Sequence, residues 1–295
     1  VLPINPLAPV TSTFIEIFCY LSAGKRVNSL SRMVFTILGC GTSTGVPLIH
    51  CHCPVCRSKN PKNRRLRASA WVQFRGKSFL IDTATDFREQ ALRARIPRID
   101  AVLYTHPHAD HIHGIDELRS FNYVQGAPIP VYGNDWTCEE FDQKFAYIFR
   151  PTAQEGGGIP QLALNRFSTA LPELVIQGAP VTPISVLHGS KESVGYRFDS
   201  IAYVTDCSYI PTASLERMKD LDVLILDCLR IEAHGTHFNL EQALEIITQV
   251  RPGKTYLTHL GHDFDYTKWA KKLPKGVALA YDGLKIRYGN STRER

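Results

Sequence analysis

The stretch Tyr104-Thr-His-Pro-His-Ala-Asp-His-Ile-His-Gly114 decides which fold the chain is expected to adopt. It follows the apolar segment 101–103, which is typical of a short buried strand, so its polar residues are expected on the loop at the carboxyl end of that strand. Within six residues it places four potential metal ligands: His106, His108, Asp110 and His111. Imidazole nitrogens and carboxylate oxygens bind Zn, Mn and Fe. The spacing H-x-H-x-D-H therefore predicts a metal centre, whereas a single histidine would usually be a packed or surface residue.

Other polar residues stand where predicted strands end. His188, Asp206 and His259 each directly follow a run of apolar and β-branched residues. A centre with two metal ions needs more ligands than one loop supplies, and these three are the candidates. Asp82 ends another such run, where it could orient a metal-binding histidine or serve as a turn or cap residue. His113 follows the motif, and we expect it to have no ligand role.

The rest of the chain predicts a mixture of short strands and helices. Strand-like runs, rich in β-branched residues and bounded by Gly, Pro or Asp, cover 34–38, 70–74, 79–82, 101–105, 129–132, 174–177, 182–187, 201–205, 223–227, 254–258 and 284–287. Helix-like runs cover 86–95, 138–148, 211–219, 240–250 and 265–272. Because strands occur in clusters as well as alternating with helices, we expect an α+β protein with αββα layers rather than a doubly wound fold.

Length and composition allow one large hydrophobic core, since the chain has 295 residues, of which 44% are hydrophobic. We expect one domain over residues 33–289, preceded by a poorly ordered N-terminal extension over residues 1–32. The segment 151–172 contains three consecutive glycines and is expected to be a loop or lid. No run of 18 or more apolar residues occurs, so no membrane span is expected.

The net charge of +6 is unevenly distributed. Residues 1–98 contain 15 Lys and Arg but only four Asp and Glu, and six of the basic residues fall between Arg57 and Arg67. This run is either a solvated face or a positive field that attracts a phosphate-bearing substrate. A nucleic-acid groove is the weaker alternative, because no aromatic residues interleave with the run as a stacking surface would require.

Three of the eight cysteines stand within six residues, as Cys51-x-Cys53-x-x-Cys56. In a long, enzyme-like chain this spacing indicates metal binding in a reducing compartment, which favours the cytoplasm. Three thiolates are one ligand short of a closed tetrahedral zinc site. His262, three residues after His259, is the candidate fourth ligand. The rivals by proximity are His50 and His52, although His52 would be cramped between two ligands.

The order of these motifs resembles the metallo-β-lactamase superfamily over nearly all of residues 34–288. The resemblance implies a four-layer αββα hydrolase fold and two catalytic divalent metals, Zn or Mn. It assigns His106, His108 and His188 to one metal, Asp110, His111 and His259 to the other, and Asp206 to both.

A narrower resemblance is to the PhnP-like phosphodiesterases, carried by Gly39-Cys-Gly-Thr-Ser-Thr-Gly-Val-Pro47, the cysteine motif and His-Pro-His-Ala-Asp-His. It implies one structural zinc, held by Cys51, Cys53, Cys56 and His262. It also implies that a histidine before the late helix contacts phosphate or protonates the leaving group. His237 matches that position, with His234 the weaker candidate, although His237 could also simply be a helix-entry residue. The coenzyme-biosynthesis protein PqqB has a similar cysteine loop.

The expected function is hydrolysis of a small, in some cases cyclic, phosphodiester through a metal-bridging hydroxide, with Asp110 and His237 as catalytic residues. One alternative is a tRNA 3′-processing nuclease, but we find no long basic, Gly-rich arm of the kind that grips tRNA. A thioesterase or lactonase would need neither His237 nor the basic field. A metal-dependent binding or carrier protein would not need the complete ligand set. The expected partner is a small phosphodiester, with nucleic acid less favoured and a homodimer left open.

Overall fold

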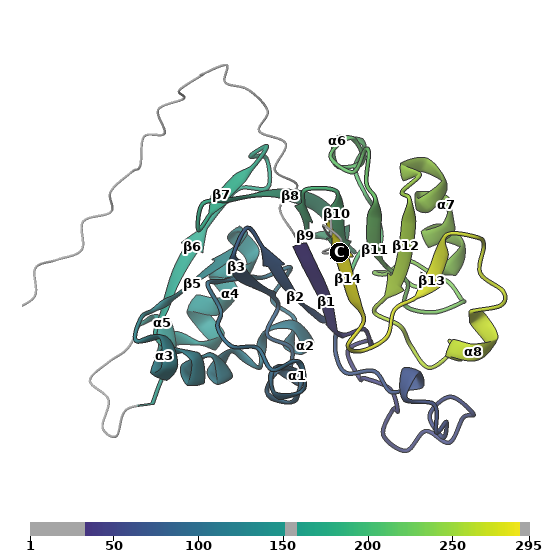
Figure 1. Ribbon diagram of the computed structural model, residues 1–295, viewed down its shortest axis with the longest axis horizontal. Coiled ribbons are helices and arrows are strands. Elements are labelled where there is room, and N and C mark those ends of the chain that lie inside the picture. The colour runs from purple at the N-terminus through teal and green to yellow at the C-terminus, as the bar shows by residue number, and fades with distance from the viewer. Residues whose placement is uncertain (1–32, 151–157, 290–295) are drawn as a thin grey trace, which may run out of the picture. The chain divides into compact units, whose positions relative to one another are not determined.

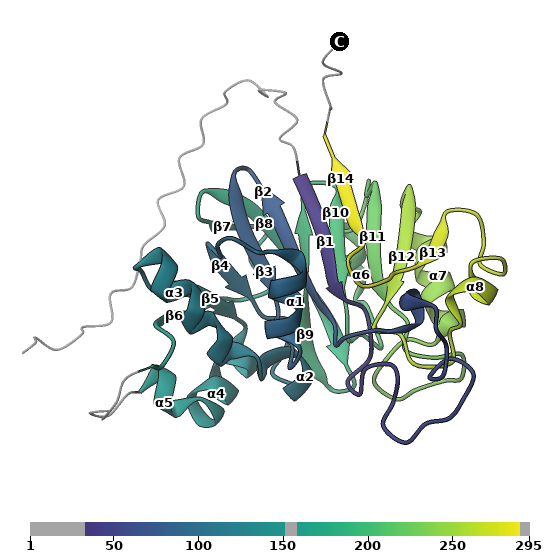
Figure 2. The ribbon, with the colours of Figure 1, turned by 60° about the horizontal axis from the view of Figure 1, so that its bottom comes forward.

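The computed structural model describes residues 33–150 and 158–289, so the N-terminal extension expected over 1–32 lies outside the described residues. The described residues form two mixed seven-stranded sheets that pack face to face, with helices on their outer faces (Figures 1 and 2). In order across the first sheet, the strands are β14 (Lys285–Tyr288), β1 (Met33–Gly39), β2 (Ser69–Phe74), β3 (Lys77–Ile81), β4 (Ala101–Leu103), β5 (Ile129–Gly133) and β6 (Leu162–Arg166). The second sheet consists, in order, of β13 (Val277–Leu279), β12 (Lys254–Thr258), β11 (Val223–Asp227), β10 (Ile201–Val204), β9 (Lys191–Phe198), β8 (Ala179–His188) and β7 (Leu174–Ile176).

The two sheets share one pattern of pairing. Each has three antiparallel pairs at one side, β14 to β3 in the first sheet and β7 to β10 in the second. Each continues with three parallel pairs, β3 to β6 and β10 to β13. The C-terminal strand β14 lies beside β1 in both views of the ribbon (Figures 1 and 2).

The helices lie in two sets. Five cover the outer face of the first sheet: α1 (Phe87–Ala94), α2 (Ala109–Ile112), α3 (Arg119–Gln125), α4 (Asp135–Lys144) and α5 (Ala146–Phe149). Three others flank the second sheet: α6 (Thr212–Glu216), α7 (Leu240–Val250) and α8 (Tyr266–Trp269). Two short 3-10 turns complete the described part, at Pro61–Asn63 and Ile115–Leu118. This arrangement confirms the expected αββα layers.

The strands β1 to β4 of the first sheet are buried on both faces, which explains their nearly continuous apolar sequences. In β3, Phe79 and Ile81 belong to the core between the sheets, whereas Leu80 packs into a second core under the helices. Aromatic rings join the two sheets: the ring of Phe198 in β9 lies 5.9 Å from that of Phe74 and 5.5 Å from that of Phe79. The space between the sheets is therefore filled by side chains at the density of a protein interior.

The carboxyl ends of the parallel strands meet at one edge of the second sheet. Leu226 of β11 pairs with Val204 of β10 and with Leu257 of β12, so the residues after these strands lie at the same level. Asp206 and His259 come two residues after the paired positions and adopt left-handed backbone angles, with φ of 52° and 56°. Such angles are uncommon outside glycine, although Asp and His adopt them more often than most other residues.

The expected elements were found, with three strands and two helices, α2 and α3, added, and the helix expected over 138–148 is divided into α4 and α5. The sequence did not predict β6, β9 or β13. The expectation that 151–172 is a loop or lid was wrong for Leu162–Arg166, which form β6 beside β5, while 151–157 lie outside the described residues. None of the helices in the described part of the chain has both the length and the apolar composition that a membrane crossing needs.

Replacing Phe198 tests how strongly the two sheets depend on their shared core. We expect Phe198→Ala to lower the free energy of unfolding by about 3–5 kcal/mol, because it removes a buried ring that contacts both sheets. Urea unfolding followed by circular dichroism measures the change. The control is Tyr123→Ala, at a side chain that is 73% exposed, which should change stability by no more than about 0.5 kcal/mol. Equal effects of the two substitutions would contradict this account of the core.

Candidate metal centre

The loop after β4 and the end of β8 bring three imidazoles together. Nε2 of His106 lies 2.9 Å from Nδ1 of His108, and Nε2 of His188 lies 3.2 Å from the same Nδ1 atom. His106 and His188 are buried, whereas His108 is exposed. The structure therefore gathers the three histidines that the resemblance assigns to one metal ion.

In two of these rings, Nδ1 is the nitrogen that points away from the other histidines, and it is already hydrogen-bonded. Nδ1 of His188 donates to the backbone oxygen of Thr236 at 2.7 Å. Nδ1 of His106 lies 3.0 Å from Oγ1 of Thr105, which itself donates to Asp82, so this nitrogen donates as well. A neutral imidazole has one donor and one acceptor nitrogen, so both rings present an Nε2 lone pair to the centre. Burial lowers the pKa of His106 and of His188, which favours the neutral rings.

A second group consists of Asp110 and His111 of α2 and His259 after β12. Nδ1 of His111 donates to Oδ2 of Asp82 at 2.7 Å, so Nε2 of the neutral ring is an acceptor. This Nε2 lies 3.2 Å from Oδ2 of Asp110, and Nε2 of His259 lies 3.6 Å from the same oxygen. All three atoms are buried and have no hydrogen-bond partner among the described residues.

Asp206 lies between the two groups. Its Oδ2 is 3.7 Å from Nε2 of His106 and 3.4 Å from Nε2 of His259. Its Oδ1 is 3.2 Å from Nε2 of His111. One buried carboxylate thus reaches ligand atoms of both groups, as a bridging residue must.

These donor atoms fit divalent cations. Buried polar atoms without partners are costly in a folded protein, and here they are lone pairs that face one another. Burial lowers the pKa of His111, but the carboxylates of Asp206, Asp110 and Asp82 outweigh it and raise that pKa well above its ordinary value. Three carboxylates beside one ring concentrate negative charge, which a cation would compensate. Imidazoles with carboxylates suit Zn or Mn.

His237, in the loop before α7, lies beside this centre. Its Nε2 is 3.8 Å from Oδ2 of Asp206, and its ring stacks on that of His259 with centroids 4.7 Å apart. Its Nδ1 lies 3.3 Å from Oδ2 of Asp227, which also accepts from the backbone nitrogen of Phe238 at 3.1 Å. Burial lowers the pKa of His237, but Asp227 and Asp206 outweigh it and raise that pKa.

Asp227 is the site residue that sequence reasoning missed. It is fully buried at the end of β11, and its Oδ1 lies 3.7 Å from Nδ1 of His259. The available signal was its position, since it ends a predicted strand as Asp82 does.

Two histidines near the motifs lie outside the groups of converging ligand atoms. His113 is exposed, and its ring meets that of Phe145 edge-on at 6.0 Å. The ring of His234 lies 5.2 Å from that of His237, but no ligand atom of His234 joins the groups found among the described residues. Both positions agree with the minor roles expected for these residues.

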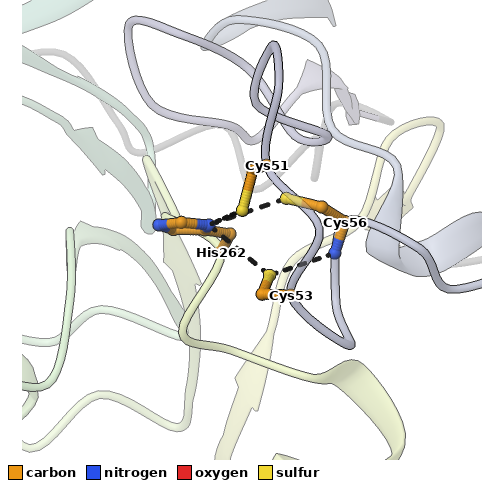
Figure 3. A group of neighbouring side chains, drawn as sticks. All are labelled: Cys51, Cys53, Cys56 and His262. Atoms are coloured by element: carbon orange, nitrogen blue, oxygen red, sulfur yellow. Dashed lines mark hydrogen bonds between the residues drawn. The ribbon is translucent and has the colours of Figure 1, made fainter.

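The cysteine loop forms a separate group with His262 (Figure 3). Nδ1 of His262 lies 3.2 Å from Sγ of Cys51 and 3.6 Å from the sulfurs of Cys53 and Cys56. A tetrahedral zinc site with ordinary bond lengths has sulfur–nitrogen edges of about 3.6 Å. The donor set therefore fits a closed structural zinc. His50 and His52, the rivals by proximity, are exposed and do not join this group.

The chain beyond the cysteines is tied to the segment that carries His262. The buried guanidinium of Arg65 donates to the backbone oxygen of Gly261 at 2.8 Å and also to that of Phe264. Asn63 donates to Asp265 at 2.9 Å and accepts from the backbone nitrogen of Tyr266 at 2.7 Å. These contacts connect the cysteine loop to the region just after His259.

The same contacts change the interpretation of the basic run. Arg65 is buried, Arg67 pairs with Asp86 at 2.9 Å, and Lys62 lies over the ring of Tyr281 at 4.2 Å. Half of the six basic residues are therefore committed to structural contacts, which weakens the hypothesis of a phosphate-attracting field.

Comparisons with known proteins agree with this geometry. A family model described as a beta-lactamase superfamily domain matches residues 77–260. The crystal structure of a new diphosphatase from the PhnP family superimposes with a TM-score of 0.81 and 44% identity, covering 88% of this chain and 98% of that one. The chain belongs to the metallo-β-lactamase superfamily, and within it to the PhnP family. Membership of this family indicates a metallo-hydrolase, and the buried His/Asp groups fit that function.

Two curated relatives extend the comparison. The octanoyltransferase of Porphyromonas gingivalis (strain ATCC BAA-308 / W83) is 34% identical over 253 residues, which are 84% of this chain and 50% of that protein. The probable metallo-hydrolase YhfI of Bacillus subtilis (strain 168) is 28% identical over 177 residues, 56% of this chain and 67% of that one. The chain thus spans about half the length of the octanoyltransferase.

Substituting Cys53 tests the cysteine group. Cys53→Ser should remove one zinc per chain and lower the melting temperature, because three ligands hold zinc less tightly than four. Activity should also fall, because loss of this zinc would displace His259. The fall should be smaller than the one caused by removing the metal ions from the His/Asp centre. Metal stoichiometry by mass spectrometry and thermal unfolding measure these effects, with Cys138→Ser as the control at a buried free cysteine in α4. A Cys53→Ser protein with three metals and an unchanged melting temperature would exclude a zinc site here.

Proposed function

We propose that the chain is a metal-dependent phosphodiesterase with two catalytic divalent metal ions and one structural zinc. The observation that carries the proposal is the set of buried, mutually facing lone pairs around Asp206. The proposed ligands are His106, His108 and His188 for one ion, Asp110, His111 and His259 for the other, Asp206 for both, and Cys51, Cys53, Cys56 and His262 for the zinc.

The chain's own contribution begins with holding these ligands in place. When bound, such metal ions activate water and stabilise negative charge on a phosphoryl oxygen. Asp82 fixes the ring of His111, and the backbone oxygen of Thr236 fixes that of His188. Orienting partners of this kind set the ring direction and tautomer, and their loss typically weakens metal binding or activity by about 10–100-fold.

His237 is placed to act on the leaving group. Asp227 holds its Nδ1, which leaves Nε2 directed toward the side of the centre where Asp206 lies. The two carboxylates raise its pKa, which favours the protonated form that can give a proton to a departing alkoxide. Helix α7 begins three residues later, at Leu240 after the N-cap Asn239, and its N-terminus also favours a bound anion.

Two substrate classes are candidates for the proposed reaction. A phosphodiester fits the single leaving group that His237 could protonate. A diphosphate linkage is the second candidate, because the relative at 44% identity is a diphosphatase. In both reactions water attacks a phosphorus atom and one P–O bond breaks to release an oxygen leaving group.

The rival functions have less support. The name octanoyltransferase belongs to a protein about twice as long as the part that this chain matches. We propose phosphoryl rather than acyl chemistry for this site. A tRNA-processing nuclease would need a surface that grips tRNA, and half of the basic run is occupied elsewhere. A carrier protein would leave the Asp227–His237 pair without a role. The free cysteines, four of them buried, fit a reducing compartment such as the cytoplasm.

Asp110→Asn tests the metal-dependent reaction. The change removes one negative charge from the second group, so turnover of bis(p-nitrophenyl) phosphate with Mn²⁺ or Zn²⁺ should fall by roughly 100-fold or more while the fold survives. The assay needs parallel metal analysis and circular dichroism. Asp135→Asn, at an exposed residue of α4, is the matched control and should leave turnover unchanged. Near-normal turnover with full metal content in Asp110→Asn would contradict the assignment of Asp110 as a metal ligand. An inactive wild-type protein on phosphodiesters and diphosphates alike, when loaded with metal, would sink the proposed function.

His237→Ala tests the protonation of the leaving group. Hydrolysis of substrates with poor alkoxide leaving groups should fall by about 10²–10⁴-fold, and that of nitrophenyl esters far less, because only the former need a proton. Asp227→Asn should show the same dependence on the leaving group, and His234→Ala is the control. Equal losses on both substrate types would indicate phosphate binding instead. No loss on either would leave His237 as a structural residue.

A further inference from the structure

Lys191, the first residue of β9, lies directly opposite His188 of the metal centre. The two residues are cross-strand partners at the tight end of the β8–β9 hairpin. In an antiparallel pair, opposite residues direct their side chains to the same face of the sheet. Ser193, two residues further along β9, shares that face, and its Oγ donates to the backbone oxygen of Thr105 at 3.4 Å. The side chain of Lys191 therefore rises on the face where the loop after β4 and the metal centre lie.

The indole of Trp136, in the first turn of α4, lies beside the first group of histidines. Its ring centroid is 5.6 Å from that of His108 and 6.0 Å from that of His106. A hydrogen bond holds this turn of α4 against β9, because Nδ2 of the N-cap Asn134 donates to the backbone oxygen of Glu192 at 3.2 Å. The indole and the start of β9 are thus fixed on the same side of the centre.

The ammonium group of Lys191 lies over this indole, with Nζ 5.8 Å from the ring centroid. A cation–π contact of this kind holds the charge in place without neutralising it. No carboxylate among the described residues forms an ion pair with Lys191. In contrast, Nζ of Lys144 donates to the backbone oxygen of Pro107 at 3.0 Å and pairs with Glu140 at 3.0 Å. Lys191 therefore supplies an uncompensated positive charge next to the histidines.

This charge lies on the side of the centre that is open to solvent. His108 is exposed, whereas His106 and His188 are buried, and Trp136 and Lys191 both reach the surface. The Cβ atoms of cross-strand partners are about 5 Å apart, and a lysine stem is long and flexible. An anionic group that projects from the centre on this side is therefore within reach of the ammonium group.

We propose that Lys191, positioned by Trp136, binds a second anionic group of the substrate, a carboxylate or phosphate carried a few atoms away from the phosphorus at the metal centre. The inference rests on the proposed phosphodiesterase function and narrows its substrates to phosphoesters that carry such a group. A diester with a single negative charge would present that charge to the metal ions and leave the ammonium group without a partner. Lysine binds anions as a point charge, so carboxylate and phosphate offer it the same chemistry.

The test compares non-hydrolysable phosphonates with and without a second anionic group. Isothermal titration of the metal-loaded protein with methylphosphonate, 3-phosphonopropanoate and ethane-1,2-diphosphonate gives three affinities. We expect at least one of the two longer ligands to bind roughly fivefold more tightly than methylphosphonate, because it adds an ion pair that methylphosphonate cannot form. The ligand with the larger gain identifies a carboxylate or a phosphate as the preferred second group.

Substitutions of Lys191 show whether the gain comes from its charge or from the metal ions. Lys191→Gln removes the charge at nearly the same length and should abolish the gain, whereas Lys191→Arg keeps the charge and should retain most of it. The readout is the ratio of two affinities, which a partial loss of folded or metal-loaded protein does not change. Lys285→Gln, at an exposed lysine of β14, is the matched control and should leave the ratio unchanged.

Two results would overturn the assignment. One is a wild-type protein that binds all three ligands equally, and the other is a Lys191→Gln protein that keeps the full gain. Hydrolysis of bis(p-nitrophenyl) phosphate by the wild-type protein, together with either result, would leave the phosphodiesterase proposal intact. An absence of that hydrolysis would contradict the proposed function, and with it the substrate role of Lys191, whatever the ratio of affinities.

Discussion

The buried carboxylate of Asp82 is the constraint on which the metal centre depends. Its two oxygens accept from the backbone nitrogen of Thr105 at 2.8 Å, from Oγ1 of Thr105 at 2.9 Å and from Nδ1 of His111 at 2.7 Å. Through Thr105 the same carboxylate also fixes the donor side of His106. Two rings are thereby turned so that their lone pairs point inward, toward Asp206. A cation would satisfy a centre built this way, because the inward atoms of His111 and Asp110 are buried without a hydrogen-bond partner among the described residues.

The two-sheet architecture explains why one site can draw ligands from so many strands. The motif loop follows β4 of the first sheet, whereas Asp206, Asp227 and His259 follow three neighbouring strands of the second. Parallel pairing puts those three ends at one level. The packing of Phe198 against Phe74 and Phe79 joins the two sheets at the opposite end of the strands.

The elements were predictable where the pattern was simple and were missed where it was broken. The helix expected over 240–250 was found at Leu240–Val250, because its apolar face repeats at helical spacing and Asn239 caps it. In contrast, β9 contains Gly195, which weakens a strand pattern. In the fold this glycine is required, because a Cβ atom there would lie 2.9 Å from Cγ2 of Val204. A close approach of two strands is a tertiary contact that no local pattern reveals.

The sequence by itself determined the superfamily, the layers and the residue types that gather at the site, because H-x-H-x-D-H and strand-end residues such as His188 and His259 carry local meaning. Only the tertiary structure decided which residue joins the three cysteines, that Asp227 holds His237, and that Arg65 is a buried clamp rather than part of a positive field. The physical reason is the separation of these partners along the chain. Spacing along the chain reports which groups lie on one loop or face, whereas partners about 200 residues apart, such as Arg65 and Gly261, meet only through the packing of the whole fold.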